Sequence, residues 1–120
     1  MKNLTIIAVA LLLTPTVAQS TCHPALSAAS DAYSNARKAY KQTDLDSCQR
    51  YAKRAFNVAS EAESYASYCR CLDAESAASD AYSNARKAYK QTDLDSCQKY
   101  AKRAYNAAKE SESSALNCGR

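Results

Sequence analysis

The sequence predicts an all-α protein made of two tandem antiparallel helical hairpins, which form a compact four-helix arrangement stapled by disulfides. Small apolar residues recur at alternating steps of four and three over long stretches, which is the spacing of one helix face. An internal repeat of 49 residues includes all six cysteines. Strands are not expected anywhere, and the single glycine, Gly119, leaves no flexible linker between the two halves.

The first 20 residues have the pattern of a secretory signal peptide. A short basic start precedes an apolar run from Leu4 to Leu13, and small residues follow at Ala18 and Ser20. The run is too short for a membrane-spanning helix, which needs roughly 20 residues. The residues before Cys22 lack a lipoprotein signal, so a lipid anchor there is not favoured. We therefore expect a secreted or periplasmic protein, in which six cysteines form disulfides.

The internal repeat divides the remaining chain into residues 21–70 and 71–120, each predicted to be one helical hairpin. Residues 22–69 match 71–118 with 11 differences in 48 positions, and 27–49 match 76–98 without a change. The cysteines obey the same offset, since Cys22, Cys48 and Cys69 map to Cys71, Cys97 and Cys118. Recent duplication without functional meaning and selection for two copies of one binding face both explain this repeat.

The first hairpin is predicted to have a helix from about residue 24 to 42 and a longer one from about 45 to 68. The second hairpin is predicted to repeat both helices 49 residues later. Pro24 suits a first helical turn because its missing N–H costs nothing there. Thr43 and Asp46 resemble a capping box at the start of the longer helix. Asp73 replaces Pro24 in the second copy and is expected to cap that helix. The apolar stripe of the first two helices is Ala25, Ala29, Ala32, Ala36 and Ala39, then Cys48, Ala52, Ala55, Ala59, Ala62, Ala66 and Cys69.

The helices restrict how the six cysteines can pair. Cys48 and Cys69 are 21 residues apart on one helix, or roughly 31 Å at 1.5 Å per residue, whereas a disulfide needs Cα atoms within about 7 Å. An antiparallel hairpin brings its first and last cysteines together instead. The predicted bonds are Cys22–Cys69, Cys71–Cys118 and Cys48–Cys97.

Two alternatives remain for the cysteines. If the two longer helices lie diagonally in the bundle, Cys48 and Cys97 are too far apart, and they stay free or link two chains in a homo-oligomer. A thiolate zinc site around Cys69-Arg70-Cys71 is the other alternative. Its C-x-C spacing is poor, and an exported chain meets an oxidising compartment, so no metal or cofactor is expected.

Catalytic motifs are missing from the sequence. His23 is the only histidine, and it lies near the mature N-terminus, where a solvated side chain is the simplest interpretation. No nucleophile elbow, zinc-protease, P-loop or dinucleotide motif occurs. The chain is therefore not expected to be an enzyme.

Basic residues gather on both sides of each turn, and acidic residues gather toward the other end of each hairpin. Removal of Lys2 leaves 15 basic and 12 acidic residues, a mild excess that does not indicate a nucleic-acid partner. Tyrosines interleave with the basic residues, a combination that binds anionic polymers or proteins. The alternative is that the tyrosines complete the core and the basic residues only face solvent. The candidate binding residues are Arg37, Tyr40, Lys41, Arg50, Tyr51, Arg54, Arg86, Tyr89, Lys90, Lys99, Tyr100 and Arg103.

The segment from Ala39 to Cys48, followed by Tyr51-Ala52 and Ala55, resembles the turn and second helix of a tetratricopeptide-like hairpin. This resemblance implies a protein-interaction scaffold. The period of 49 differs from the ~34 residues of that family, and two copies are few for a solenoid. A compact bundle is therefore expected over an open superhelix.

Two functions fit these features. The first is a structural or protein-interaction module that binds another exported protein. The second is an anion-binding module that uses the basic residues and tyrosines near the turns on a polysaccharide, a lipopolysaccharide or a membrane surface.

Overall fold

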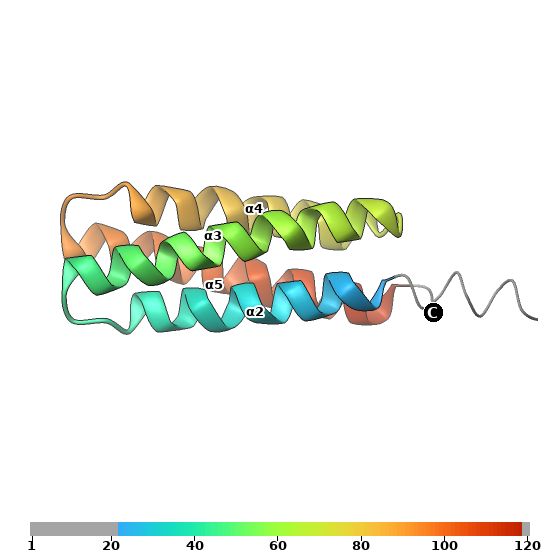
Figure 1. Cartoon of the computed structure of the whole chain (residues 1–120), viewed down its shortest axis with the longest axis horizontal. Helices are drawn as coiled ribbons and strands as arrows, with labels where there is room; N and C mark the ends of the chain where they lie inside the picture. Colours follow the sequence, from blue (N-terminus) through green and yellow to red (C-terminus); the bar gives the residue numbers. More distant parts are fainter. Residues whose placement is uncertain (1–21, 119–120) are drawn as a thin grey trace, which may run out of the picture.

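Four helices make up the computed structural model, which describes residues 22–118 (Figure 1). They are α2 (His23–Tyr40), α3 (Leu45–Tyr68), α4 (Leu72–Tyr89) and α5 (Leu94–Asn117). No strand occurs between residues 22 and 118, and the all-α prediction is confirmed. The predicted signal peptide lies outside the described residues. None of the described helices is long and apolar enough to cross a membrane.

The helices form a square bundle in which each one lies beside two others. Both α2 and α4 pack along α3 and α5, so α3 and α5 face each other across one diagonal. The two short turns lie at one end, here named the turn pole, which is on the left in Figure 1. Cys22, Cys69, Cys71 and Cys118 lie at the opposite end, here named the cysteine pole. The predicted compact four-helix arrangement is confirmed.

Alanine fills almost the whole core. Four-alanine layers cross the bundle, for example Ala36, Ala55, Ala85 and Ala104, each about 1% exposed. A single methyl group provides little burial energy, at about 0.8 kcal/mol per buried CH₂. It also lets the backbones approach closely, so the core is thin and the bundle narrow. Disulfides therefore matter more here than in a bundle with a leucine core, since each typically contributes about 2–4 kcal/mol.

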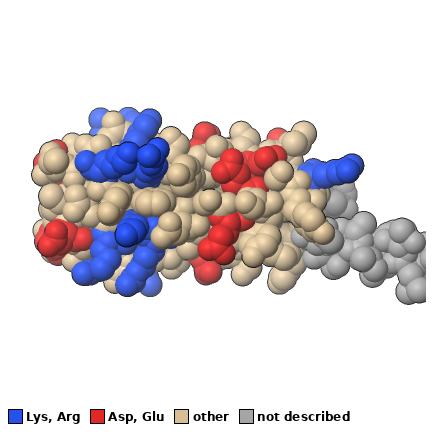
Figure 2. All heavy atoms as spheres, turned by 45° about the horizontal axis from the view of Figure 1, so that its top comes forward, with Lys and Arg blue, Asp and Glu red and all other residues tan. Residues whose placement is uncertain are grey.

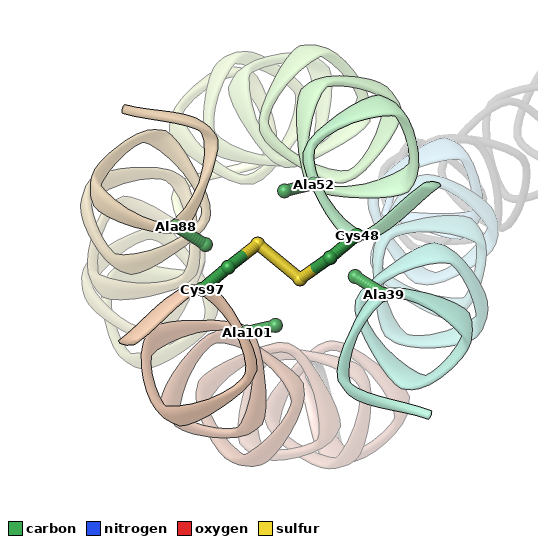
Figure 3. Packing of buried hydrophobic residues seen from close by; sticks show 6 residues of the cluster. All are labelled: Ala39, Cys48, Ala52, Ala88, Cys97 and Ala101. Carbon is green, nitrogen blue, oxygen red and sulfur yellow. A yellow bond between two sulfur atoms is a disulfide. The ribbon is translucent and has the colours of Figure 1, made fainter. Parts of the chain in front are cut away.

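All three predicted disulfides are present. Cys22–Cys69 and Cys71–Cys118 close the two hairpins at the cysteine pole, with Cα–Cα distances of 5.3 and 6.0 Å. Cys48–Cys97 joins α3 to α5 across the diagonal at 6.3 Å (Figure 3). The diagonal does not prevent this bond because the other fully buried residues of its layer are all alanines, Ala39, Ala52, Ala88 and Ala101. No described cysteine is free.

The helix starts differ from two predictions. Asp44, not Thr43, is the N-cap of α3, and its carboxylate accepts a hydrogen bond from the backbone N–H of Ser47 at 2.8 Å. Asp73 lies inside the first turn of α4, whose N-cap is Cys71 without a side-chain cap. The turn is therefore one residue longer than a Thr43 cap would make it. Asp73 is instead one of two acidic residues in the first turn of α4, where a negative charge interacts favourably with the helix dipole.

A pair of matching hydrogen bonds fastens the turn pole. The Gln49 side-chain amide donates to the carbonyl oxygen of Gln91, and Gln98 donates likewise to Gln42, both at 2.6 Å. Each glutamine thus reaches from one hairpin to the turn of the other. Together with Cys48–Cys97, these bonds fix the two hairpins beneath the side chains near the turns.

Candidate functional site

The basic residues near the turns form a band around the bundle. Figure 2 shows most Lys and Arg side chains of one face gathered close to the turn pole, with acidic side chains on both sides of them and one further basic group near the opposite end. Acidic residues also occupy the very end, because Asp46 and Asp95 lie in the first turns of α3 and α5. All members of this basic band are exposed: Arg37, Lys38, Lys41, Arg50, Lys53, Arg54, Arg86, Lys87, Lys90, Lys99, Lys102 and Arg103.

Tyr51 on α3 is the centre of one cluster within the band. The Arg54 guanidinium lies 5.3 Å from the centre of its ring, and Arg50 and Lys38 each lie at 5.9 Å. Arg50 and Arg54 come from the same helix as Tyr51, whereas Lys38 reaches across from α2. We call these four residues the α2/α3 cluster. The ring attracts the cations through its quadrupole, which at exposed positions is worth about 0.5–1 kcal/mol per contact.

Tyr100 on α5 is the centre of an equivalent α4/α5 cluster. Arg103 lies 5.3 Å from the centre of the Tyr100 ring, and Lys87 and Lys99 each lie at 6.0 Å. Lys99 takes the place of Arg50, which is the only residue that differs between the two clusters. Both clusters therefore present three cations held close to one partly buried tyrosine.

The other candidate tyrosines lie where the two hairpins meet. Tyr40 packs against Tyr105 with ring centres 5.3 Å apart, and Tyr89 packs against Phe56 at 5.6 Å. Lys53 lies over the Tyr89 ring at 5.7 Å. These aromatic pairs join the hairpins, so Tyr40 and Tyr89 differ in surroundings from Tyr51 and Tyr100.

A second tyrosine pair breaks the equivalence of the two halves. Tyr33 and Tyr105 stack with ring centres 4.7 Å apart, and their hydroxyl oxygens lie 3.3 Å from each other. The hydrogen bond between Tyr33 and Tyr105, with Lys109, Arg37 and Lys41 nearby, lowers the pKa of Tyr105. The same hydrogen bond, together with burial, raises the pKa of Tyr33. In the repeat, Phe56 is equivalent to Tyr105 and Tyr82 is equivalent to Tyr33. Phe56 has no hydroxyl group, so Tyr82 cannot form the corresponding hydrogen bond with it.

The remaining candidates are Arg37, Lys41, Arg86 and Lys90. Arg37 and Lys41 lie near Tyr105, as its lowered pKa reflects. Arg86 and Lys90 line a pocket of about 170 Å³ on α4, together with Tyr82 and with Lys87 of the α4/α5 cluster. All candidate residues thus lie within one band.

Lys38 and Lys87 belong to the clusters but were not among the candidate binding residues predicted above. Lys38 on α2 lies over the ring of Tyr51 on α3 at 5.9 Å, and Lys87 on α4 lies over the ring of Tyr100 on α5 at 6.0 Å. Spacing along one helix does not indicate either lysine, because each reaches its tyrosine from the neighbouring helix of the same hairpin.

Two grooves toward the cysteine pole differ from one another. The groove between α2 and α5 has a volume of about 650 Å³ and includes His23, Leu26 and Leu116. Its counterpart between α3 and α4 has Leu72 and Glu75 at the positions of His23 and Leu26. The two halves therefore diverge at the cysteine pole, whereas in the half of the bundle next to the turns only Arg50/Lys99 and Phe56/Tyr105 differ.

Neither a metal site nor a family relationship adds to this description. Residues 22–118 hold no group of three or more side chains that could bind a metal ion, and their six cysteines are all in disulfides. No protein-family model matches the chain, and neither a curated protein nor a solved structure matches it.

Proposed function

We propose that the protein is an exported, non-enzymatic interaction module whose basic band binds an anionic polysaccharide. The observation that carries this proposal is the pair of tyrosine-centred clusters, built from the same residue types at nearly the same distances. The three disulfides support an oxidising compartment such as the periplasm or the extracellular space. Sulfate, phosphate or uronate groups supply the negative charge that such clusters attract.

The aromatic contacts prepare the cations for binding. A free lysine or arginine loses about 0.5–1.5 kcal/mol of conformational freedom when a ligand immobilises it. Arg54 and Arg103 already rest against tyrosine rings before any ligand arrives. Part of that cost is thus met in the folded protein, and the affinity per contact rises accordingly.

The arrangement of the clusters favours a polymer over a membrane. One cluster lies on the α2/α3 side of the square bundle and the other on the α4/α5 side, which is the opposite side. A flat membrane can touch only one side of a rigid rod at a time. A polysaccharide chain can reach either side, so it is the ligand that uses both clusters.

Binding to immobilised sulfated and uronate-containing polysaccharides tests the proposal. Removing both clusters in K38Q/R50Q/R54Q/K87Q/K99Q/R103Q is expected to abolish binding. The control R70Q/K109Q removes basic residues outside the band and is expected to bind normally. Wild-type binding is expected to fall steeply with salt, because the Debye length shrinks from about 8 Å at physiological ionic strength to about 3 Å at 1 M.

Other outcomes would contradict the proposal. Retention on the polysaccharide at molar salt would show that charge does not drive binding. Anionic vesicles that bind the protein when the polysaccharides do not would point to a membrane surface instead. The circular dichroism of each variant must match that of the wild type, so that lost binding is not lost folding.

A second candidate is a protein partner bound at the cysteine pole, in line with the resemblance to interaction scaffolds. Tyr68 is 80% exposed and Leu72 74% exposed, on both sides of the connection between the hairpins. Large apolar side chains exposed together often indicate a protein contact. A pull-down from the native compartment, with Y68S/L72S as the matched control, tests this candidate. A partner recovered equally by both proteins would rule out this surface.

A further inference from the structure

The two cation–tyrosine clusters lie back to back on a rigid body. Each cluster is formed within one hairpin, from α2 with α3 or from α4 with α5. Since the helices follow one another around the square, these two sides have the bundle between them (Figures 1 and 3). No single straight ligand strand can lie on both sides.

The two clusters are also nearly equal in composition and geometry. Arg54–Tyr51 and Arg103–Tyr100 share a distance of 5.3 Å, and the two lysine contacts made across the hairpins differ by only 0.1 Å, at 5.9 and 6.0 Å. Residues 27–49 are identical to 76–98 and residues 51–55 to 100–104, so Arg50 and Lys99 are the one difference between the clusters. Two such sites are expected to bind the same ligand with similar affinity.

The thickness of the bundle makes the two sites independent of each other. One helix with its side chains is about 10–12 Å across, so two helices side by side separate the clusters by about 20 Å. This exceeds the Debye length of about 8 Å at physiological ionic strength. A polyanion on one side therefore repels a second one on the other side only weakly.

The fold also keeps both sites in a fixed relative orientation. Cys48–Cys97 joins the hairpins at the level of the clusters, and the amides of Gln49 and Gln98 bind the opposite turns. A ligand bound to one cluster therefore cannot rotate the other hairpin so that both clusters contact the same ligand strand. A single strand that used both sites would have to bend around the rod.

We infer that one molecule of this protein bridges two separate strands of an anionic polysaccharide, one strand on each cluster. The inference rests on the proposed function and adds the number of polysaccharide strands that one protein molecule binds. The protein would then act as a cross-link between polysaccharide strands and not as a coat on one of them.

Calorimetry with a short sulfated oligosaccharide, too short to reach both sides, measures the valency directly. The wild type is expected to bind two oligosaccharides per molecule with similar affinity. The variants K38Q/R50Q/R54Q and K87Q/K99Q/R103Q, which each lose one cluster, are expected to bind one. The control R70Q/K109Q, which loses two positive charges outside the clusters, is expected to bind two.

Light scattering with a long sulfated polysaccharide then measures bridging. Wild type and control are expected to raise the scattering near equivalence, whereas either single-cluster variant binds without raising it. A single oligosaccharide per wild-type molecule, or equal scattering from the single-cluster variants, would overturn bridging and leave polysaccharide binding intact. A wild type that binds no oligosaccharide would instead overturn the proposed function itself. Unchanged circular dichroism and intact disulfides in each variant exclude misfolding.

Discussion

The Cα atoms of Cys48 and Cys97 lie 6.3 Å apart, although they belong to helices that face each other across the diagonal of the bundle. Because a Cα atom lies about 2.3 Å from its helix axis, the axes of α3 and α5 are about 11 Å apart here, whereas a square bundle with neighbouring axes about 10 Å apart has diagonal axes about 14 Å apart. The short diagonal is a consequence of the surrounding residues, since Ala39, Ala52 and Ala88 each contribute only a methyl group to this layer (Figure 3). The disulfide and the alanine core therefore depend on each other.

Enlarging a core alanine is expected to destabilise the bundle. Ala108 is buried in a layer with Ala32, Ala59 and Ala81, so Ala108→Val leaves no room for the added carbons and is expected to cost about 1–3 kcal/mol. Ala107→Val is the matched control, because Ala107 is only partly buried and its counterpart in the first half is already Val58. Denaturant unfolding with the disulfides intact measures both. Equal costs for the two variants would show that helix propensity, and not packing, limits the residue size.

The three disulfides are expected to differ in their resistance to reduction. A thiolate must reach the sulfur that it attacks, so access affects the rate. Cys48 and Cys97 are fully buried, whereas Cys22, Cys69 and Cys118 are partly exposed. Limited reduction followed by alkylation and peptide mapping should therefore label the cysteine pole first and Cys48–Cys97 last. Early labelling of Cys48 would indicate that the turn pole opens more readily than the other end.

The sequence predicted the helices and the disulfides because both follow from regular geometry. The repeated alanine spacing defined the helix faces, and helix length alone excluded a Cys48–Cys69 bond. The choice between neighbouring residues that could each cap a helix was harder to predict. Thr43 and Asp44 are both good N-caps, and only the course of the turn decides that Asp44 accepts the Ser47 hydrogen bond.

The candidate site was predictable only in part. The basic residues and tyrosines near the turns were evident from composition, but the partner of each tyrosine depends on contacts between helices. Tyr51 finds Lys38 across a hairpin, whereas Tyr40 finds Tyr105 across the junction between hairpins. The spacing of residues along one helix does not predict which of these two partners a tyrosine contacts.

The hydrogen-bonded pair Tyr33 and Tyr105 is expected to titrate in two separate steps. Tyr105 ionises first, because its phenolate accepts the hydrogen bond from Tyr33 and has Lys109, Arg37 and Lys41 nearby, which lowers its pKa below the ordinary value. Tyr33 ionises later, since the same hydrogen bond raises its pKa. Tyr33→Phe is expected to raise the pKa of Tyr105, and Tyr105→Phe to lower the pKa of Tyr33. Ultraviolet titration of phenolate absorbance measures both, with Tyr82→Phe as the control that leaves the pair intact. An unchanged Tyr105 transition in Tyr33→Phe would mean that the bond does not control the titration.

An isolated second hairpin, residues 71–120, is expected to form a covalent dimer that reproduces the whole bundle. The hairpin keeps its own Cys71–Cys118 bond and its internal hydrogen bond from the Ser111 hydroxyl to the Ala74 carbonyl oxygen, at 2.9 Å. Its exposed alanine stripe needs a partner, and a second copy offers nearly the same stripe as residues 22–69 do in the full chain. Cys97 of one copy then meets Cys97 of the other in the place of Cys48.

Size-exclusion chromatography and non-reducing electrophoresis of the oxidised hairpin measure this association. The dimer is expected to resist dissociation without reductant and to match the full chain in helical content. Cys97→Ser is the matched control, in which the dimer loses its covalent link and dissociates on dilution. A monomeric hairpin with an unpaired Cys97 would show that the two halves recognise each other through the residues in which they differ, and not through the alanine faces that they share.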